Sequence, residues 1–114
     1  LSRRHPLHCH CFVRTSKDAE RWMKSFKNVM FGFTSLLVGN SDLMTVVEQT
    51  IPLDKILLET DAPFLLPPAY RGSTNKSNPD MILEVAREIA YIKNLPLKLI
   101  CQPSVQNACQ LYHI

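Results

Sequence analysis

The sequence has no apolar run close to the roughly 20 residues that a membrane-spanning helix needs, so we expect no membrane partner. Its four cysteines include none of the Cys-x-x-Cys pairs that are typical of structural zinc sites. No apolar signal-peptide core follows Arg3 and Arg4, and we therefore expect reduced thiols in an intracellular protein of the cytoplasm or nucleus. The chain begins at Leu1 rather than at a methionine, and one expectation is that it is a fragment of a longer protein.

What is present is typical of one compact globular domain. The 114 residues are 46% hydrophobic and 20% charged, which is enough apolar material for a single core. The formal net charge of +3 is too small to choose between a nucleic-acid partner and none. No internal repeat or low-complexity tract divides the chain.

Apolar periodicity predicts alternating strands and helices. Strands are expected at about 7–13, 29–34 and 56–61, with helices between them from Ser16 to about Asn28 and over 42–49. This order favours right-handed crossovers and a parallel sheet. Asn78, followed by Pro79, predicts the start of a further helix that ends near residue 93. Pro103 is expected to open a last helix, with Tyr112 packing inward.

Two carboxylates alternate at the end of the third predicted strand. Glu59 and Asp61 share one strand face, and Ala62-Pro63 ends the strand because proline has no N–H to donate. In α/β enzymes the carboxyl ends of strands hold metal ligands and acid–base groups. The alternative is that the two carboxylates only cap a loop or the next helix.

Two histidines alternate in the same way on the first predicted strand. His8 and His10 would share a face, and two imidazoles near a strand end can bind metal. The alternative is that they are ordinary core or surface groups. The long loop after residue 61 carries Arg71 and Lys76, which either meet an anionic ligand or are simply solvated.

Beyond these patterns, the sequence resembles the C-terminal part of the TatD-type metal-dependent deoxyribonucleases. The resemblance covers nearly the whole chain from Leu7 onward. The matching segments are His10-Cys11-Phe12, Gly32-Phe33-Thr34, the run Leu58-Glu59-Thr60-Asp61-Ala62-Pro63-Phe64-Leu65, Arg71-Gly72-x-x-Asn75, and Asn107 with Leu111-Tyr112. The resemblance implies an α/β fold: the C-terminal three βα units of a TIM-type (β/α)8 barrel. A whole barrel takes about 250 residues, so residues 1–114 would be the C-terminal portion of one hydrolase domain, incomplete in this chain.

The same resemblance implies a two-metal phosphodiester hydrolase acting on DNA. His10 matches a histidine ligand of one divalent ion. Asp61 matches the aspartate that serves the other ion and helps to activate the attacking water. Glu59 matches a carboxylate of the same motif that supports the ligands. Carboxylates suit Mg²⁺, and added imidazoles also admit Mn²⁺ or Zn²⁺.

Three further residues are implied to contact substrate. Arg71 is expected to brace a phosphate, and Asn75 to position the loop or the nucleotide. In this sequence Val13-Arg14 stands where the family continues with Ser or Thr and then Gly. Arg14 is therefore a further candidate for phosphate binding.

The resemblance leaves two functional hypotheses. The other histidines and the bridging glutamate of the family lie in strands that these residues do not contain. One ligand of each ion remains, so the first hypothesis is a nuclease piece that is inactive alone and needs the missing N-terminal half of the barrel as its partner. The alternative is a catalytically inactive truncated form that acts as a binding or assembly module.

Overall fold

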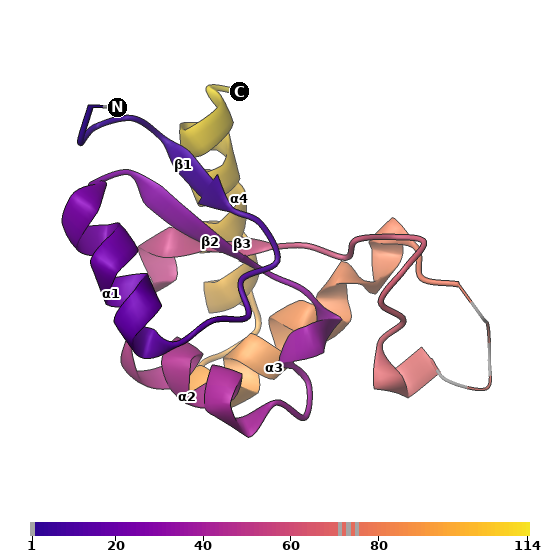
Figure 1. Cartoon of the computed structure of the whole chain (residues 1–114). Helices are drawn as coiled ribbons and strands as arrows, with labels where there is room; N and C mark the ends of the chain where they lie inside the picture. Colours follow the sequence, from indigo (N-terminus) through magenta and orange to yellow (C-terminus); the bar gives the residue numbers. More distant parts are fainter. Residues whose placement is uncertain (1, 71, 73, 75) are drawn as a thin grey trace.

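A computed structural model of the chain describes residues 2–70, 72, 74 and 76–114, and its centre is a parallel sheet of three strands (Figure 1). The strands are β1 (Leu7–Cys9), β2 (Val29–Phe33) and β3 (Ile56–Leu58), in the spatial order β1-β2-β3. Leu7 pairs with Val29, and Phe31 pairs with Ile56. The predicted parallel α/β arrangement is confirmed.

Helices connect and follow the strands. The helix α1 (Ser16–Ser25) joins β1 to β2, and α2 (Ser41–Gln49) joins β2 to β3. The helices α3 (Ile82–Lys93) and α4 (Lys98–Tyr112) come after β3. Short 3-10 turns lie at Ser35–Leu37, Leu53–Lys55, Pro68–Tyr70 and Pro79–Met81. None of the helices in the described part of the chain is long and apolar enough to cross a membrane.

Two apolar clusters lie on opposite faces of the sheet. The larger one contains Phe31 and Phe33 of β2, both fully buried, together with side chains of α1, α2 and α3. Burial of each phenylalanine contributes about 1.5–3 kcal/mol. The smaller cluster contains Met30 and Leu57, which alternate with the first set along their strands, and Leu111 of α4.

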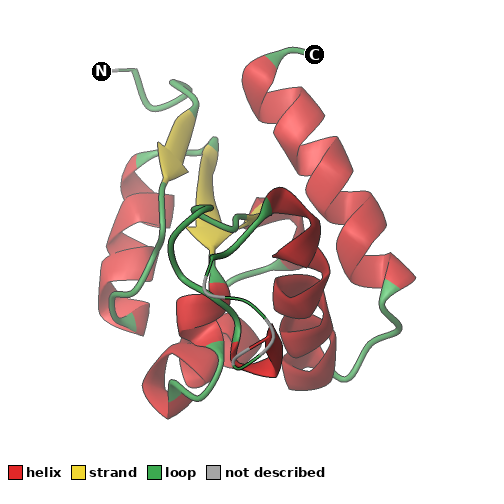
Figure 2. Cartoon of the chain, turned by 90° about the vertical axis from the view of Figure 1, so that its right-hand side faces the viewer, coloured by secondary structure: helices red, strands yellow, loops and turns green. Residues whose placement is uncertain are grey.

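The helix α4 crosses from one face of the sheet to the other. Ile100 near its beginning belongs to the larger cluster, whereas Leu111 near its end belongs to the smaller one. Figure 2 shows α1 and α4 on opposite sides of the sheet. The buried Asn107 fixes this crossing, because its Nδ2 donates to the carbonyls of Leu53 and Ile56, each at 2.8 Å. The C-terminal end of α4 is thereby brought over the face that carries Met30 and Leu57.

All three strands end earlier than the predicted ranges, β1 and β3 by the most. The backbone turns into the left-handed region at Cys11 (φ 48°) and at Asp61 (φ 56°), so the extended alternation stops before both residues. Strand alternation predicts that Phe12 shares the face of His8 and His10. This prediction is wrong, because the turn at Cys11 directs Phe12 to the other face. Phe12 is buried in the larger cluster against Phe31, with ring centroids 4.9 Å apart.

The predicted start of the last helix is also wrong. It begins at Lys98 and contains Pro103 in its interior, rather than starting at that proline. A proline there removes one intrahelical hydrogen bond, since it has no N–H. The first turn is retained because Ile100 is buried in the core.

Candidate metal centre

The carboxylate of Glu59 lies at the centre of the site. Glu59 follows β3 directly, and its N–H donates to the carbonyl of Phe33 at 2.8 Å. Its side chain passes over Gly32 of the neighbouring strand. A methyl group at Gly32 would overlap this carboxylate and would lie 2.7 Å from Nε2 of His8. The glycine in the middle of β2 therefore makes the space in which the carboxylate lies.

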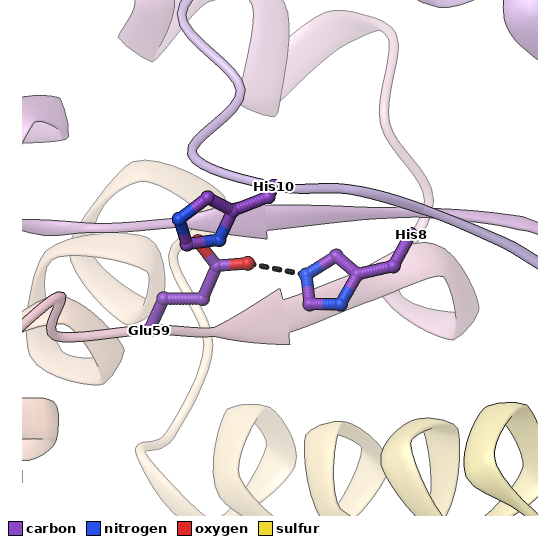
Figure 3. Close-up of side chains that lie close together, drawn as sticks. All are labelled: His8, His10 and Glu59. Atoms are coloured by element: carbon purple, nitrogen blue, oxygen red, sulfur yellow. Dashed lines mark hydrogen bonds and ion pairs between the residues drawn. The ribbon is translucent and has the colours of Figure 1, made fainter.

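Both histidines of the first strand region reach Glu59 (Figure 3). The Nε2–H of His8 donates to Oε2 of Glu59, and Nδ1 of His10 is 2.9 Å from Oε1. The backbone N–H of Cys11 also donates to Oε1, at 2.8 Å. Because the left-handed turn at Cys11 aims this N–H at the carboxylate, the backbone and two imidazoles together hold Glu59 in place.

The surroundings of Glu59 change its acidity. Burial of the side chain, which is 9% exposed, raises the pKa. The hydrogen bonds from His8 and Cys11 and the charges of His8 and His10 outweigh burial, so the pKa of Glu59 lies below its ordinary value of 4.5. The carboxylate is therefore ionised at neutral pH and available to the two imidazoles.

Asp61 lies on the outer side of this group. Its Oδ1 is 3.8 Å from Nε2 of His10, and the two side chains are 43% and 61% exposed. Two ligand atoms about 2.1 Å from one divalent ion are separated by about 3–4 Å. The pair therefore fits a shared ion or two adjacent ones. Glu59 supports this, because a carboxylate on one nitrogen of an imidazole orients the other nitrogen for metal binding.

A tyrosine of the last helix completes the network. The hydroxyl of Tyr112 is hydrogen-bonded to Nδ1 of His8, although the two residues are 104 positions apart. The rings of His8 and Tyr112 meet edge to face with centroids 5.9 Å apart. One chain of contacts therefore runs from α4 through His8 and Glu59 to His10.

The structure brings together four of the residues singled out in the sequence, namely His8, His10, Glu59 and Asp61. Among the described residues, His8, His10 and Glu59 form a group of possible metal ligands whose ligand atoms lie within 4.8 Å of one another. The ligand set implied by the resemblance omits His8. Its position two residues before His10 nevertheless indicates that the two imidazoles lie on the same strand face. Tyr112 lies in a segment that matches the family, but no local pattern indicates its contact with His8.

The structure describes one of the three predicted substrate contacts, Arg14, which is not part of this group. Arg14 pairs with Asp18 across the first turn of α1, with Nε 3.3 Å from Oδ2. Arg71 and Asn75 lie outside the residues that the structure describes.

Comparison with known proteins gives the family of this chain. A family model described as "TatD related DNase" matches residues 2–113. The chain belongs to the TatD family. The predicted family resemblance is confirmed. His10 and Asp61, which the sequence resemblance singles out, approach each other through Nε2 and Oδ1.

Relatives of this TatD chain are longer proteins. It is 35% identical to the human 3'-5' RNA nuclease TATDN2, covering 95% of this chain and 14% of the human protein. It is 33% identical to YabD of Bacillus subtilis, described as an uncharacterised metal-dependent hydrolase, over 92% of this chain and 40% of that protein. The chain therefore spans less than half the length of these relatives.

Solved structures give the same fold. The crystal structure of YJJV, a TatD homologue of Escherichia coli, superposes with a TM-score of 0.82 at 23% identity, covering 95% of this chain and 40% of that one. An uncharacterised amidohydrolase of Saccharomyces cerevisiae superposes with a TM-score of 0.79 at 18% identity. The superposition covers 96% of this chain and 41% of the yeast protein. The chain accordingly has the fold of the C-terminal three βα units of a TIM-type barrel, incomplete in these residues.

Proposed function

We propose that residues 1–114 are the C-terminal portion of one metal-dependent phosphodiesterase domain that cleaves DNA. The observation that carries this proposal is the approach of His10 Nε2 to Asp61 Oδ1, 3.8 Å apart, with His10 held from behind by Glu59. These residues belong to two segments, one after β1 and one after β3, that the parallel sheet brings to the same edge. The same two residues are the ones that the family resemblance singles out.

The chemistry follows from these groups. Two divalent ions, with Mg²⁺ as the first candidate and Mn²⁺ or Zn²⁺ as others, would polarise the scissile phosphate and lower the pKa of a bound water. Asp61 would accept a proton from the water that attacks phosphorus, and the 3′-oxygen, whose bond to phosphorus breaks, would take up a proton from solvent. His10 contributes its Nε2 as a ligand, and Glu59 keeps the ring in position through Nδ1.

This function requires the rest of the barrel. His10 and Asp61 give at most two protein ligands, which is fewer than divalent ions usually take. We therefore propose that the preceding half of the barrel is the partner of this chain, and that the chain alone is inactive. We place the assembled enzyme in the cytoplasm or nucleus, where nucleic acid is present.

A second candidate function is a catalytically inactive binding or assembly module. An apolar hollow of about 310 Å³ lies between α3, α4 and β3. Leu83, Val105 and Tyr112 line it and are exposed. A hollow of this kind favours the packing of another apolar surface.

The test measures nucleic-acid cleavage by the longer protein that includes the preceding barrel strands, and compares the wild type with site variants. Labelled DNA and RNA strands of the same sequence are incubated with Mg²⁺, since the human relative is named an RNA nuclease. We expect His10→Ala and Asp61→Asn each to reduce cleavage at least 100-fold, because each removes a ligand. His5→Gln is the matched control, since His5 is an exposed histidine outside the site. Full activity of both site variants would contradict the proposal and favour the second candidate.

A further inference from the structure

The group formed by His8, His10 and Glu59 has a donor set that differs from the pair His10 and Asp61. It offers two imidazole nitrogens and one carboxylate, all within 4.8 Å. It uses Nδ1 of His10, which faces Glu59 at 2.9 Å, whereas Asp61 faces Nε2. The two arrangements therefore lie on opposite sides of the same imidazole ring and can be distinguished by experiment.

We infer that His8 Nε2, His10 Nδ1 and Glu59 form a site for one zinc-type transition-metal ion that is complete within this chain. Two histidines and a glutamate with an open fourth position make a ligand set that suits Zn²⁺. Mg²⁺ takes oxygen ligands almost exclusively, so two nitrogens in three donors select against it. The inference does not depend on the proposed nuclease function.

The spacing of the three side chains is compatible with one ion. Ligand atoms at about 2.1 Å from a tetrahedral ion are about 3.4 Å apart. His8 contacts Oε2 of Glu59, as the dashed line in Figure 3 marks, and His10 contacts Oε1, so an ion would take the place now filled by hydrogen-bonding protons. The wider separations close by rotation of His10, whose side chain is 61% exposed.

Two contacts hold the ligands ready for an ion. The N–H of Cys11 donates to Oε1 of Glu59 at 2.8 Å and fixes this carboxylate. The hydroxyl of Tyr112 contacts Nδ1 of His8. A hydroxyl can donate or accept, so Tyr112 can accept from Nδ1–H when Nε2 binds the ion. A partner of this kind on the remote nitrogen strengthens metal binding by an imidazole.

The absence of a side chain at Gly32 leaves the space in which the Glu59 carboxylate and Nε2 of His8 meet. The side chain of His10 is 61% exposed, which leaves a path for the ion. Other histidines do not take part: His5 and His113 are exposed and do not belong to a described group of possible ligands.

The experiment titrates Zn²⁺ into the full 114-residue chain by calorimetry against a competing chelator. Co²⁺ absorption reports tetrahedral geometry in parallel. We expect one ion per chain, and at least a 10-fold loss of affinity in His8→Gln and in Glu59→Gln. Tyr112→Phe should weaken binding by about 10-fold, which is typical of removing a supporting contact. His5→Gln should bind as the wild type does, and Asp61→Asn should lose less affinity than His8→Gln.

Each result decides the inference. Absence of stoichiometric binding overturns it, and so does wild-type affinity in His8→Gln. A loss of Zn²⁺ affinity in Asp61→Asn with no loss in His8→Gln also overturns the inference, because the ion then lies on the Nε2 side of His10. Circular dichroism without metal shows which variants fold, and His8→Asn replaces His8→Gln if the latter does not. The readout is binding to the chain alone, so this assay and the cleavage assay fail independently.

Discussion

Substitution of Gly32 by alanine tests the geometry on which the whole site depends. The added methyl group would overlap the Glu59 carboxylate and would lie 2.7 Å from Nε2 of His8. The carboxylate is 9% exposed and bonded to two imidazoles and a backbone N–H, so it cannot move aside without breaking contacts. Gly32→Ala should therefore destabilise the fold and separate Glu59 from at least one histidine.

The change in the free energy of unfolding caused by Gly32→Ala is the sum of two opposing contributions. Overpacking of a buried site costs about 1–3 kcal/mol, and replacing a strand glycine by alanine returns about 0.5–1 kcal/mol of backbone entropy. We expect a net loss of about 1–2 kcal/mol in the free energy of unfolding. In urea this corresponds to a fall in the midpoint of about 0.5–1 M for a small domain.

A double-mutant cycle separates the clash from other effects. In the Glu59→Ala background the obstructing carboxylate is absent, so Gly32→Ala should cost about 1 kcal/mol less than in the wild type. Urea unfolding of the four proteins, followed by circular dichroism, gives the coupling energy. Equal costs in both backgrounds would refute the reasoning, and so would a Gly32→Ala protein as stable as the wild type.

Three further predictions concern the supports of the site. Asn107→Ala leaves two backbone carbonyls without their 2.8 Å donor, so urea unfolding should show a loss of about 1–3 kcal/mol, and a change below about 0.5 kcal/mol would contradict the role of this residue. Burial raises the pKa of Glu59, but its hydrogen bonds hold the pKa below 4.5; its stabilisation is therefore present above about pH 4.5 and lost as the pH falls through the folded value. Urea midpoints measured between about pH 7 and pH 3 should fall more steeply for the wild type than for Glu59→Gln, and parallel curves would show that Glu59 does not contribute. Thr15 accepts from the N–H of Asp18 at the start of α1, so Thr15→Ala should lower the free energy of unfolding by about 1 kcal/mol while Thr15→Ser retains it; equal stability of both variants would exclude a capping role.

Local sequence patterns predict the framework of the fold because they depend on neighbours along the chain. Apolar runs bounded by polar segments predict three parallel strands, and all three are present. The cap at Asn78 is confirmed, since its side chain accepts from the N–H of Asp80 at 2.9 Å. The position of Glu59 after the last strand, near the histidines of the first, follows from the parallel order of the strands.

The details of the site depend on contacts that no local pattern contains. The turn at Cys11 is supported by its hydrogen bond to Glu59, 48 residues away, and it moves Phe12 into the core. The contact of Tyr112 with His8 requires the crossing of α4 over the sheet, which Asn107 fixes through carbonyls at the start of β3. Such pairings depend on tertiary packing, and periodicity alone does not reveal them.

The left-handed backbone at Asp61 has a consequence for the interpretation of large mutational surveys. Aspartate, asparagine and glycine adopt φ 56° readily, whereas most other residues pay about 1–2 kcal/mol there. A survey of all substitutions at this position would thus mix loss of a carboxylate with loss of a turn. Substitution by asparagine or glycine would remove only the carboxylate, whereas substitution by valine or isoleucine would remove the carboxylate and also disfavour the turn. A selection that depends on folding alone should retain the first two residues and deplete the β-branched ones.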